Sequence, residues 1–316
     1  MNKKFFDFIE DLARKHPGEK FALAISGGLD SMALLHWFAA TGLPGVALTV
    51  DHGLRPESAA EAAAVGKAAA KLNIAHETLH WTGAKPDAGL EAAARKARYD
   101  LMLDYCRAHN IGILMTAHQA DDQIETFLMN LARGSGVYGL GGIRAVGQRD
   151  GIIIARPLLQ VPRDELKKYC DDNGIEYFND SMNSDEKFTR VKIRKNRAAL
   201  REALGISDER LLLAIDNLSR ARDDLESRAA FVENRWTASE FFALSTELQL
   251  KTLSRVIQSV GNLAYAPRLQ SVKDLLYDMR AQTNMKRTLG HCTIRRLNDK
   301  IIIVPEGESA SFRRKN

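Results

Sequence analysis

The chain has 316 residues, 45% of them hydrophobic and 27% charged, with three cysteines and a formal net charge of +5. This length favours about two domains, and because no apolar run approaches the ~20 residues of a membrane span, we expect neither a membrane anchor nor a secretory leader. The cysteines lie far apart and form no CxxC pair, which favours a cytoplasmic protein and argues against a cysteine-ligated zinc or iron–sulfur centre. The positive net charge points weakly to an anionic partner.

Short apolar runs alternate with helical stretches from Phe21 to about Phe178. The pattern predicts strands over Phe21–Ile25, Gly45–Val50, His76–Trp81, Ile111–Met115 and Gly151–Ala155. It predicts helices over Ser31–Ala40, Glu57–Leu72, Leu90–His109, Asp121–Leu131 and Arg163–Asn173. This alternation predicts an α/β fold with a doubly wound, mostly parallel sheet, whose ligands bind at the carboxyl ends of the strands.

The pattern changes after about Ala198. Amphipathic helices are predicted over Leu211–Val232, Leu248–Val260 and Ser271–Met279, followed by short strands over Thr293–Arg296 and Ile301–Val304. We therefore predict an α/β domain over residues 1–200, a smaller, mainly helical domain over 201–306, and a flexible tail over 307–316.

A glycine-containing loop, Ser26–Ser31 (SGGLDS), follows the first predicted strand and opens a helix. Gly27 and Gly28 let the backbone turn sharply, and the helix directs its N–H groups and positive dipole end at the turn, which suits a phosphate. Ser26 and Ser31 add hydroxyl groups, and Asp30 is a candidate Mg²⁺ ligand. A simple glycine turn is the alternative, but the fixed offsets of Asp and Ser favour a phosphate site that lacks the lysine of the usual nucleotide P-loop.

Other polar residues are predicted to reach the same edge of the sheet. Asp51 and His52 follow the second predicted strand, and His118 follows the fourth, so we expect all three near a bound nucleotide. Asp121, Asp122 and Glu125 open a helix, where they either cap its first turn or form a negative pocket for an ammonium group, Mg²⁺ or both, with Asp121 as a second candidate metal ligand.

Two groups of basic residues stand out. Glu91, Arg95 and Arg98 share one predicted helix. They form either a solvated, ion-paired face or a site that stabilises negative charge, and Arg95 can simply pair with Glu91. Between residues 187 and 201 no acid occurs, so this segment is either a solvated basic helix or a contact with an RNA backbone. Its candidate RNA-binding residues are Arg190, Lys192, Lys195 and Arg197.

Together these motifs resemble a known family. The SGGLDS loop is similar to the SGGxDS loop of the PP-loop ATP pyrophosphatases, which break ATP between its α- and β-phosphates. The further motifs, in chain order, are Val50–Arg55, Glu91–Tyr99, Ala117–Thr126, Leu131–Gly136, Ala155–Leu159, Asn179–Asn183, Thr189–Arg194 and, near the end, Arg287–Cys292. As an ordered set they resemble the tRNA(Ile)-lysidine synthetase family, in a short form without the third domain of longer members.

The resemblance implies ATP-dependent joining of L-lysine to C2 of the wobble cytidine in the CAU anticodon of an isoleucine tRNA, through an adenylated cytidine. It implies ATP and Mg²⁺ as cofactors, Asp122 and Glu125 as lysine-binding residues, and Asp30, Arg98 and Arg194 as catalytic residues. The sequence departs from the family at Val191–Lys192, which leaves the catalytic arginine of this segment open. A homodimer is one arrangement that would compensate for the missing domain.

The motifs are compatible in part with three other functions. A tRNA thiolase is expected to have paired cysteines, and a glutamine-dependent synthetase needs a glutaminase domain; the sequence has neither. An RNA-binding module without activity would have no use for the phosphate loop.

Overall fold

The computed structural model describes residues 2–54, 56–83, 85–86, 88–178, 189–228, 234–263 and 265–308, without the side chains of residues 189–191 and 195. The chain forms two compact units, residues 1–219 and 220–316. The division falls inside one long helix, whereas the predicted domain boundary near residue 200 lies in the helix before it. The Asn179–Asn183 motif and Lys187 lie outside the described residues.

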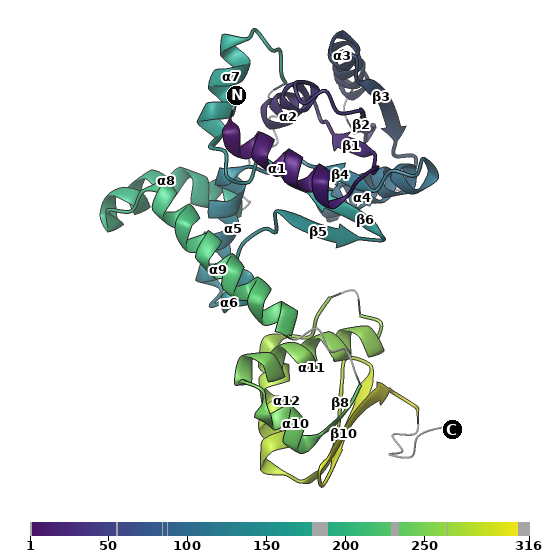
Figure 1. Cartoon of the computed structure of the whole chain (residues 1–316), viewed down its shortest axis with the longest axis vertical. Helices are drawn as coiled ribbons and strands as arrows, with labels where there is room; N and C mark the ends of the chain where they lie inside the picture. Colours follow the sequence, from purple (N-terminus) through teal and green to yellow (C-terminus); the bar gives the residue numbers. More distant parts are fainter. Residues whose placement is uncertain are drawn as a thin grey trace. The chain divides into compact units, whose positions relative to one another are not determined.

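The first unit is built on a six-stranded sheet with strand order β3-β2-β1-β4-β6-β5 (Figure 1). Its strands are β1 (Phe21–Ala24), β2 (Gly45–Asp51), β3 (Ala75–His80), β4 (Ile113–Met115), β5 (Val146–Arg149) and β6 (Ile152–Ala155). All pair in parallel except β5, which forms an antiparallel hairpin with β6. The predicted α/β fold is confirmed, although the polar strand β5 was not foreseen.

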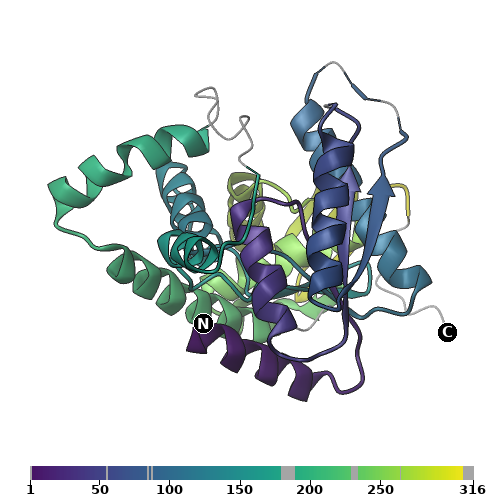
Figure 2. The same ribbon diagram turned by 90° about the horizontal axis from the view of Figure 1, so that it is seen from above.

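Helices cover both faces of this sheet (Figures 1 and 2). One face carries α1 (Lys3–Lys15), α2 (Leu29–Ala39), α3 (Ser58–Lys71) and α7 (Arg163–Asp172), and the other carries α4 (Leu90–Ala108). Side chains alternate along β1 accordingly: Phe21 and Leu23 enter the first core, and Ala22 enters the second.

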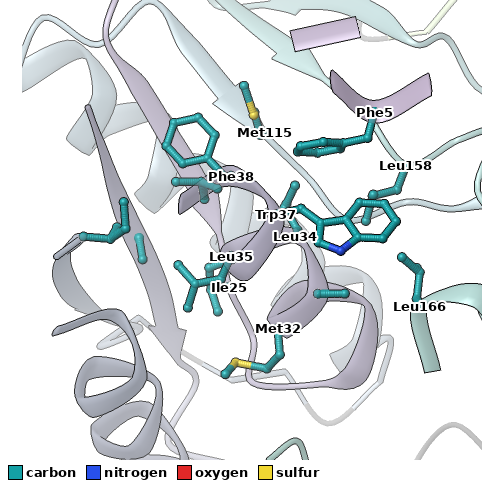
Figure 3. Packing of buried hydrophobic residues seen from close by; sticks show 14 of the residues in the cluster. Phe5, Ile25, Met32, Leu34, Leu35, Trp37, Phe38, Met115, Leu158 and Leu166 are labelled. Carbon is teal, nitrogen blue, oxygen red and sulfur yellow. The ribbon is translucent and has the colours of Figure 1, made fainter. Parts of the chain in front are cut away.

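The larger core is centred on aromatic contacts between helices. The Trp37 ring of α2 meets Phe5 of α1 at 5.4 Å and Tyr169 of α7 at 5.5 Å between centroids, both edge to face. Figure 3 shows Phe5, Leu158 and Leu166 around this tryptophan. The helix α1, which the sequence analysis did not predict, therefore closes the core over α2.

The remaining helices of the first unit are α5 (Ala120–Ala132), α6 (Val137–Leu140) and α8 (Thr189–Leu204), and α9 (Asp208–Arg228) runs on into the second unit. Ile124 and Phe127 of α5 pack against Leu211 and Ile215 of α9 in a separate small core. This packing fixes the acidic start of α5 relative to the helices that follow the basic segment.

The second unit has a four-stranded antiparallel sheet with order β7-β10-β9-β8. Its elements are β7 (Arg235–Thr237), α10 (Ala238–Ala243), α11 (Thr246–Val260), α12 (Leu269–Ala281), β8 (Asn284–Leu289), β9 (Cys292–Leu297) and β10 (Lys300–Pro305). The two predicted strands correspond to β9 and β10, and two further strands join them. Within the described ranges, no helix is both long and apolar enough to cross a membrane.

Candidate active site

The loop after β1 is shaped to receive an anion. Gly27 has a φ of +82°, and a Cβ there would lie 2.8 Å from the Phe178 ring, so this position requires glycine. The Ser31 hydroxyl donates to the Gly28 carbonyl (2.9 Å) and accepts from the Ser26 N–H (3.2 Å). Because no side chain caps α2, its first N–H groups remain directed at the loop.

Asp30 lies in the first turn of α2 and is the one carboxyl of the Ser26–Ser31 loop, and its pKa is strongly shifted. Burial raises its pKa to about 6, the Arg163 cation acts in the opposite direction, and the charges of Asp122 and Asp121 add to the rise. Arg163 Nε lies 3.5 Å from Asp30 Oδ1, an oxygen that is buried and has no hydrogen-bond partner. The fold therefore brings Asp30 close to the acidic start of α5.

The residues at the other strand ends are also partly buried. Asp51 Oδ1 accepts from the Gly53 N–H at 2.8 Å, and this bond lowers the pKa of Asp51. Burial, with Arg98 nearby, lowers the pKa of His52, so its imidazole is neutral at pH 7. His118 Nδ1 is bonded to the Thr116 hydroxyl at 2.8 Å. The structure thus orients all three side chains, while their contact with ATP stays a prediction.

The three carboxylates of α5 have different surroundings. Asp122 accepts from the Gln119 N–H at 3.1 Å in a capping box, which is the helix-capping alternative considered for this cluster. Glu125 is fully buried, and its Oε1 accepts from Nε (2.9 Å) and Nη2 (2.8 Å) of Arg194. A cation therefore already sits on the glutamate that we predict to bind lysine.

A second arginine of α8 is neutralised in the same way. Arg197, only 12% exposed, bonds Asp121 at 3.0 Å and Asp208 of α9 at 2.6 Å. This guanidinium connects α5, α8 and α9, so its predicted contact with RNA would require breaking two ion pairs. Lys192 is exposed, and the side chains of Arg190 and Lys195 lie outside the described residues.

A cavity of about 890 Å³ adjoins the acidic helix. Asp121, Arg194 and Arg197 line one part of it, and Arg163 and Asp208 line another. Its size is within the range of small-molecule sites. The sequence did not single out Arg163. It directly follows the ARPLLQVP stretch, whose start is one of the family-like motifs. The available signal was a basic residue that opens a helix after a strand of the sheet.

These residues also fit a magnesium ion. Asp30 offers a buried, unpartnered oxygen, and Asp121 lies near enough to affect its charge. The part of the chain that the structure describes contains no cluster of three or more His, Cys, Asp or Glu suited to a metal. One or two carboxylates are nonetheless what Mg²⁺ takes from a protein when phosphate oxygens and water complete its coordination.

The sheet order and the uncapped loop after β1 define a PP-loop protein, and the PP-loop domain family matches residues 1–199. A U34-tRNA thiolase, NcsA from Methanococcus maripaludis with its [4Fe–4S] cluster, has the same fold, with a TM-score of 0.53 over 70% of this chain and 79% of that chain at 17% identity.

Closer relatives cover nearly the whole chain. The tRNA(Ile)-lysidine synthase of Rhodopseudomonas palustris is 37% identical over 312 residues, covering 90% of this chain and 89% of the relative. That of Ruegeria pomeroyi is 36% identical over 292 residues, covering 88% and 69%. The chain belongs to the tRNA(Ile)-lysidine synthase family.

Proposed function

We propose that the protein is a ligase that joins L-lysine to C2 of the wobble cytidine of the CAU-anticodon isoleucine tRNA at the expense of ATP. The observation that carries this proposal is the phosphate-binding loop beside a buried glutamate that binds a cation, in a chain of this family. An anion site and a cation site close together are what the joining of a nucleotide to an amine requires.

The first step forms a bond between cytidine O2 and the α-phosphorus of ATP and releases pyrophosphate. The Ser26–Ser31 loop holds the departing pyrophosphate through the first N–H groups of α2, and Arg98 stabilises the negative charge that develops. Asp30, with Asp121, is where Mg²⁺ would be held; when bound, it neutralises phosphate charge. Asp51, His52 and His118 line the nucleotide site at the neighbouring strand ends.

In the second step the bound ε-ammonium of lysine loses a proton to water, the resulting amine attacks C2, the C2–O2 bond breaks, and AMP leaves with that oxygen. Glu125, assisted by Asp122, binds the amine, and the lysine cation takes the place of the Arg194 guanidinium on Glu125. Arg194 is then available to the phosphate of the leaving AMP, as its predicted catalytic role requires. Arg190, Lys192 and Lys195 are proposed to contact the tRNA backbone.

A thiolase is the alternative that the shared fold raises. All three cysteines are buried, and they lie apart in α4, α7 and β9. No pair of them is available for sulfur transfer, which supports the ligase.

The direct experiment incubates the protein with labelled lysine, ATP and isoleucine tRNA transcripts carrying a CAU or a GAU anticodon. Label should enter only the CAU transcript, with one AMP and one pyrophosphate formed per lysine. Glu125→Gln should raise the KM for lysine by tenfold or more and leave that for ATP unchanged, because an ammonium loses a charged partner worth at least ~1.4 kcal/mol.

Glu10→Gln, which changes an exposed glutamate of α1, is the matched control and should behave as wild type. An unchanged lysine KM in Glu125→Gln would assign the α5 acids to metal binding or helix capping. Absence of label from both transcripts would overturn the proposed reaction.

A further inference from the structure

Arginines from three parts of the chain gather around one buried tyrosine of α4, which packs on the face of the sheet. Tyr99 of α4 is 9% exposed. The guanidinium carbons of Arg95 and Arg149 lie 5.4 and 5.2 Å from the centre of its ring. Arg156, the first residue after β6, lies close enough to the Tyr99 hydroxyl for the two to interact. Arg98 is the neighbour of Tyr99 on α4.

Most of these arginines pair with no carboxylate among the described residues. Arg149 pairs with Asp100 at 3.1 Å, but Arg95, Arg98 and Arg156 form no ion pair with any carboxylate that the structure describes. The alternative in which Arg95 pairs with Glu91 is therefore not what the structure contains: Arg95 lies over a ring instead.

Two of these guanidinium groups are also poorly solvated. Arg156 Nη1 donates to the Arg144 carbonyl at 2.9 Å, while its Nε is buried without an acceptor. Burial, and to a lesser degree the nearby Arg95 cation, lowers the pKa of both Arg98 and Arg156. Clustered, partly desolvated cations are unfavourable unless an anion completes them.

The arginines of α8 are in the opposite condition. Arg194 and Arg197 are held by Glu125, Asp121 and Asp208. Among the arginines of this cluster and of the described part of α8, those without a carboxylate partner are thus on α4 and after β6, whereas Arg194 and Arg197 of the basic segment are paired.

The position of the cluster distinguishes it from the pyrophosphate site. The phosphate loop follows β1, whereas Arg156 follows β6, two strands further along the sheet and so about 10 Å away. Arg98 lies near His52 at the end of β2, on the other side of β1 from Arg156. Arg156 is therefore separate from the phosphate loop, whereas Arg98 lies near a strand end that we expect at the nucleotide.

We propose that Arg95 and Arg156 bind a backbone phosphate of the tRNA beside the reacting cytidine. This inference rests on the proposed function, which brings an RNA to this part of the sheet. A guanidinium binds a phosphate through two parallel hydrogen bonds, and the Tyr99 ring holds Arg95 in place for that contact. Such a contact fixes the anticodon loop while one base leaves its stack.

The experiment measures binding of the CAU-anticodon tRNA, and of its anticodon stem-loop alone, across a salt series. Arg95→Gln should weaken binding of both RNAs and reduce the slope of log affinity against log salt by about 0.7, the value for one single-strand phosphate contact. Arg95→Lys should retain the slope, because it retains the charge. ATP affinity should not change in either variant.

Arg107→Gln is the control, because Arg107 lies on the same helix at its other end and is paired with Asp104. Arg156→Gln should act like Arg95→Gln. Because Arg95 is exposed, its variant remains informative even if the variant of the half-buried Arg156 fails to fold.

An unchanged slope in Arg95→Gln would overturn the site. A loss of ATP affinity with unchanged RNA binding would also overturn it, by assigning the cluster to the nucleotide's phosphates. Because binding is measured without turnover, a wild-type protein that binds RNA but forms no lysidine would refute the proposed function and leave the phosphate site standing.

Discussion

Asp30 illustrates how a residue that we propose to act in catalysis can oppose stability. Its ordinary pKa is 3.8, and burial raises the folded value to about 6. The folded protein therefore binds this proton more tightly than the unfolded chain. Protonation of Asp30 therefore adds to the free energy of unfolding. This contribution is fully present below about pH 4 and is lost as the pH rises through 6.

Asp30→Asn should consequently stabilise the protein at pH 7, by up to about 3 kcal/mol, because the amide needs no charge in this site. The gain should disappear near pH 4, while adenylate formation should be lost at every pH. Thermal unfolding of both proteins between pH 4 and pH 8 checks this, together with pyrophosphate release. A variant that is less stable than wild type at pH 7 would mean that the ionised carboxylate is favourably placed in the folded protein.

The sequence indicated candidate residues where chemistry and chain position coincide. Asp30 and Glu125 were singled out because each lies near the start of a helix that follows a strand of the sheet, and their roles stay predictions. Capping of α5 by Asp122 was one of the two interpretations that the sequence left open, and the structure contains it. The sequence could not predict that Arg197 is neutralised, because this depends on Asp208, whose relevance appears only in the folded chain. For Arg95 it had no way to choose between Glu91 and the Tyr99 ring.

At the scale of elements, α8 is attached largely by charge. Its arginines reach α5 and α9, and its two largest exposed apolar residues, Leu200 and Leu204, are 39% and 60% exposed. The helix carries the basic residues that are proposed to meet RNA, so its attachment through ion pairs makes it easier to move than the helices packed in the main core.

Arg197→Ala should loosen α8 and destabilise the first unit by about 1–3 kcal/mol, because two partly buried carboxylates lose their shared partner. Amide hydrogen exchange should accelerate in residues 189–204 and remain unchanged in α1 and α2. Arg201→Ala is the matched control: Arg201 is 49% exposed and reaches only Asp208, so its loss should change stability by less than ~1 kcal/mol. Equal effects of the two substitutions would contradict this account.

The elements themselves were predictable where apolar residues follow a regular period. All five strands of the parallel part of the sheet lie within two residues of their predicted limits. The strands that were missed, β5, β7 and β8, alternate between exposed and half-buried positions or are very short, and they carry few apolar residues. Pairing with a neighbouring strand stabilises such segments, and sequence period alone does not record it.

At the scale of the whole molecule, the two units have separate hydrophobic cores. Phe241, Leu253 and Ile294 belong to a core made only of residues after 235, and the sheet of the first unit shares none of its residues. Separate cores are the physical basis for independent folding.

A fragment of residues 1–228 should therefore fold and bind ATP with the affinity of the full chain. Its affinity for tRNA should fall, because the second unit carries a further group of basic residues, Lys286, Arg287, Arg295 and Arg296, which we expect to extend the contact with the RNA backbone. Calorimetry with ATP and filter binding with tRNA test the two statements, with the full chain as reference. Unchanged tRNA affinity would place the whole RNA contact on the first unit.

The strand order also has a consequence for how the chain is made. The first strand to be synthesised, β1, is central: Phe21 pairs with Gly45 on one side and with Ile113, roughly 90 residues later, on the other. At ~5–20 residues per second, a ribosome needs about 5–20 s to supply that second neighbour. Until then the nascent protein exposes an apolar edge in the middle of its future sheet, and chaperones that bind the emerging chain have most to protect during that interval.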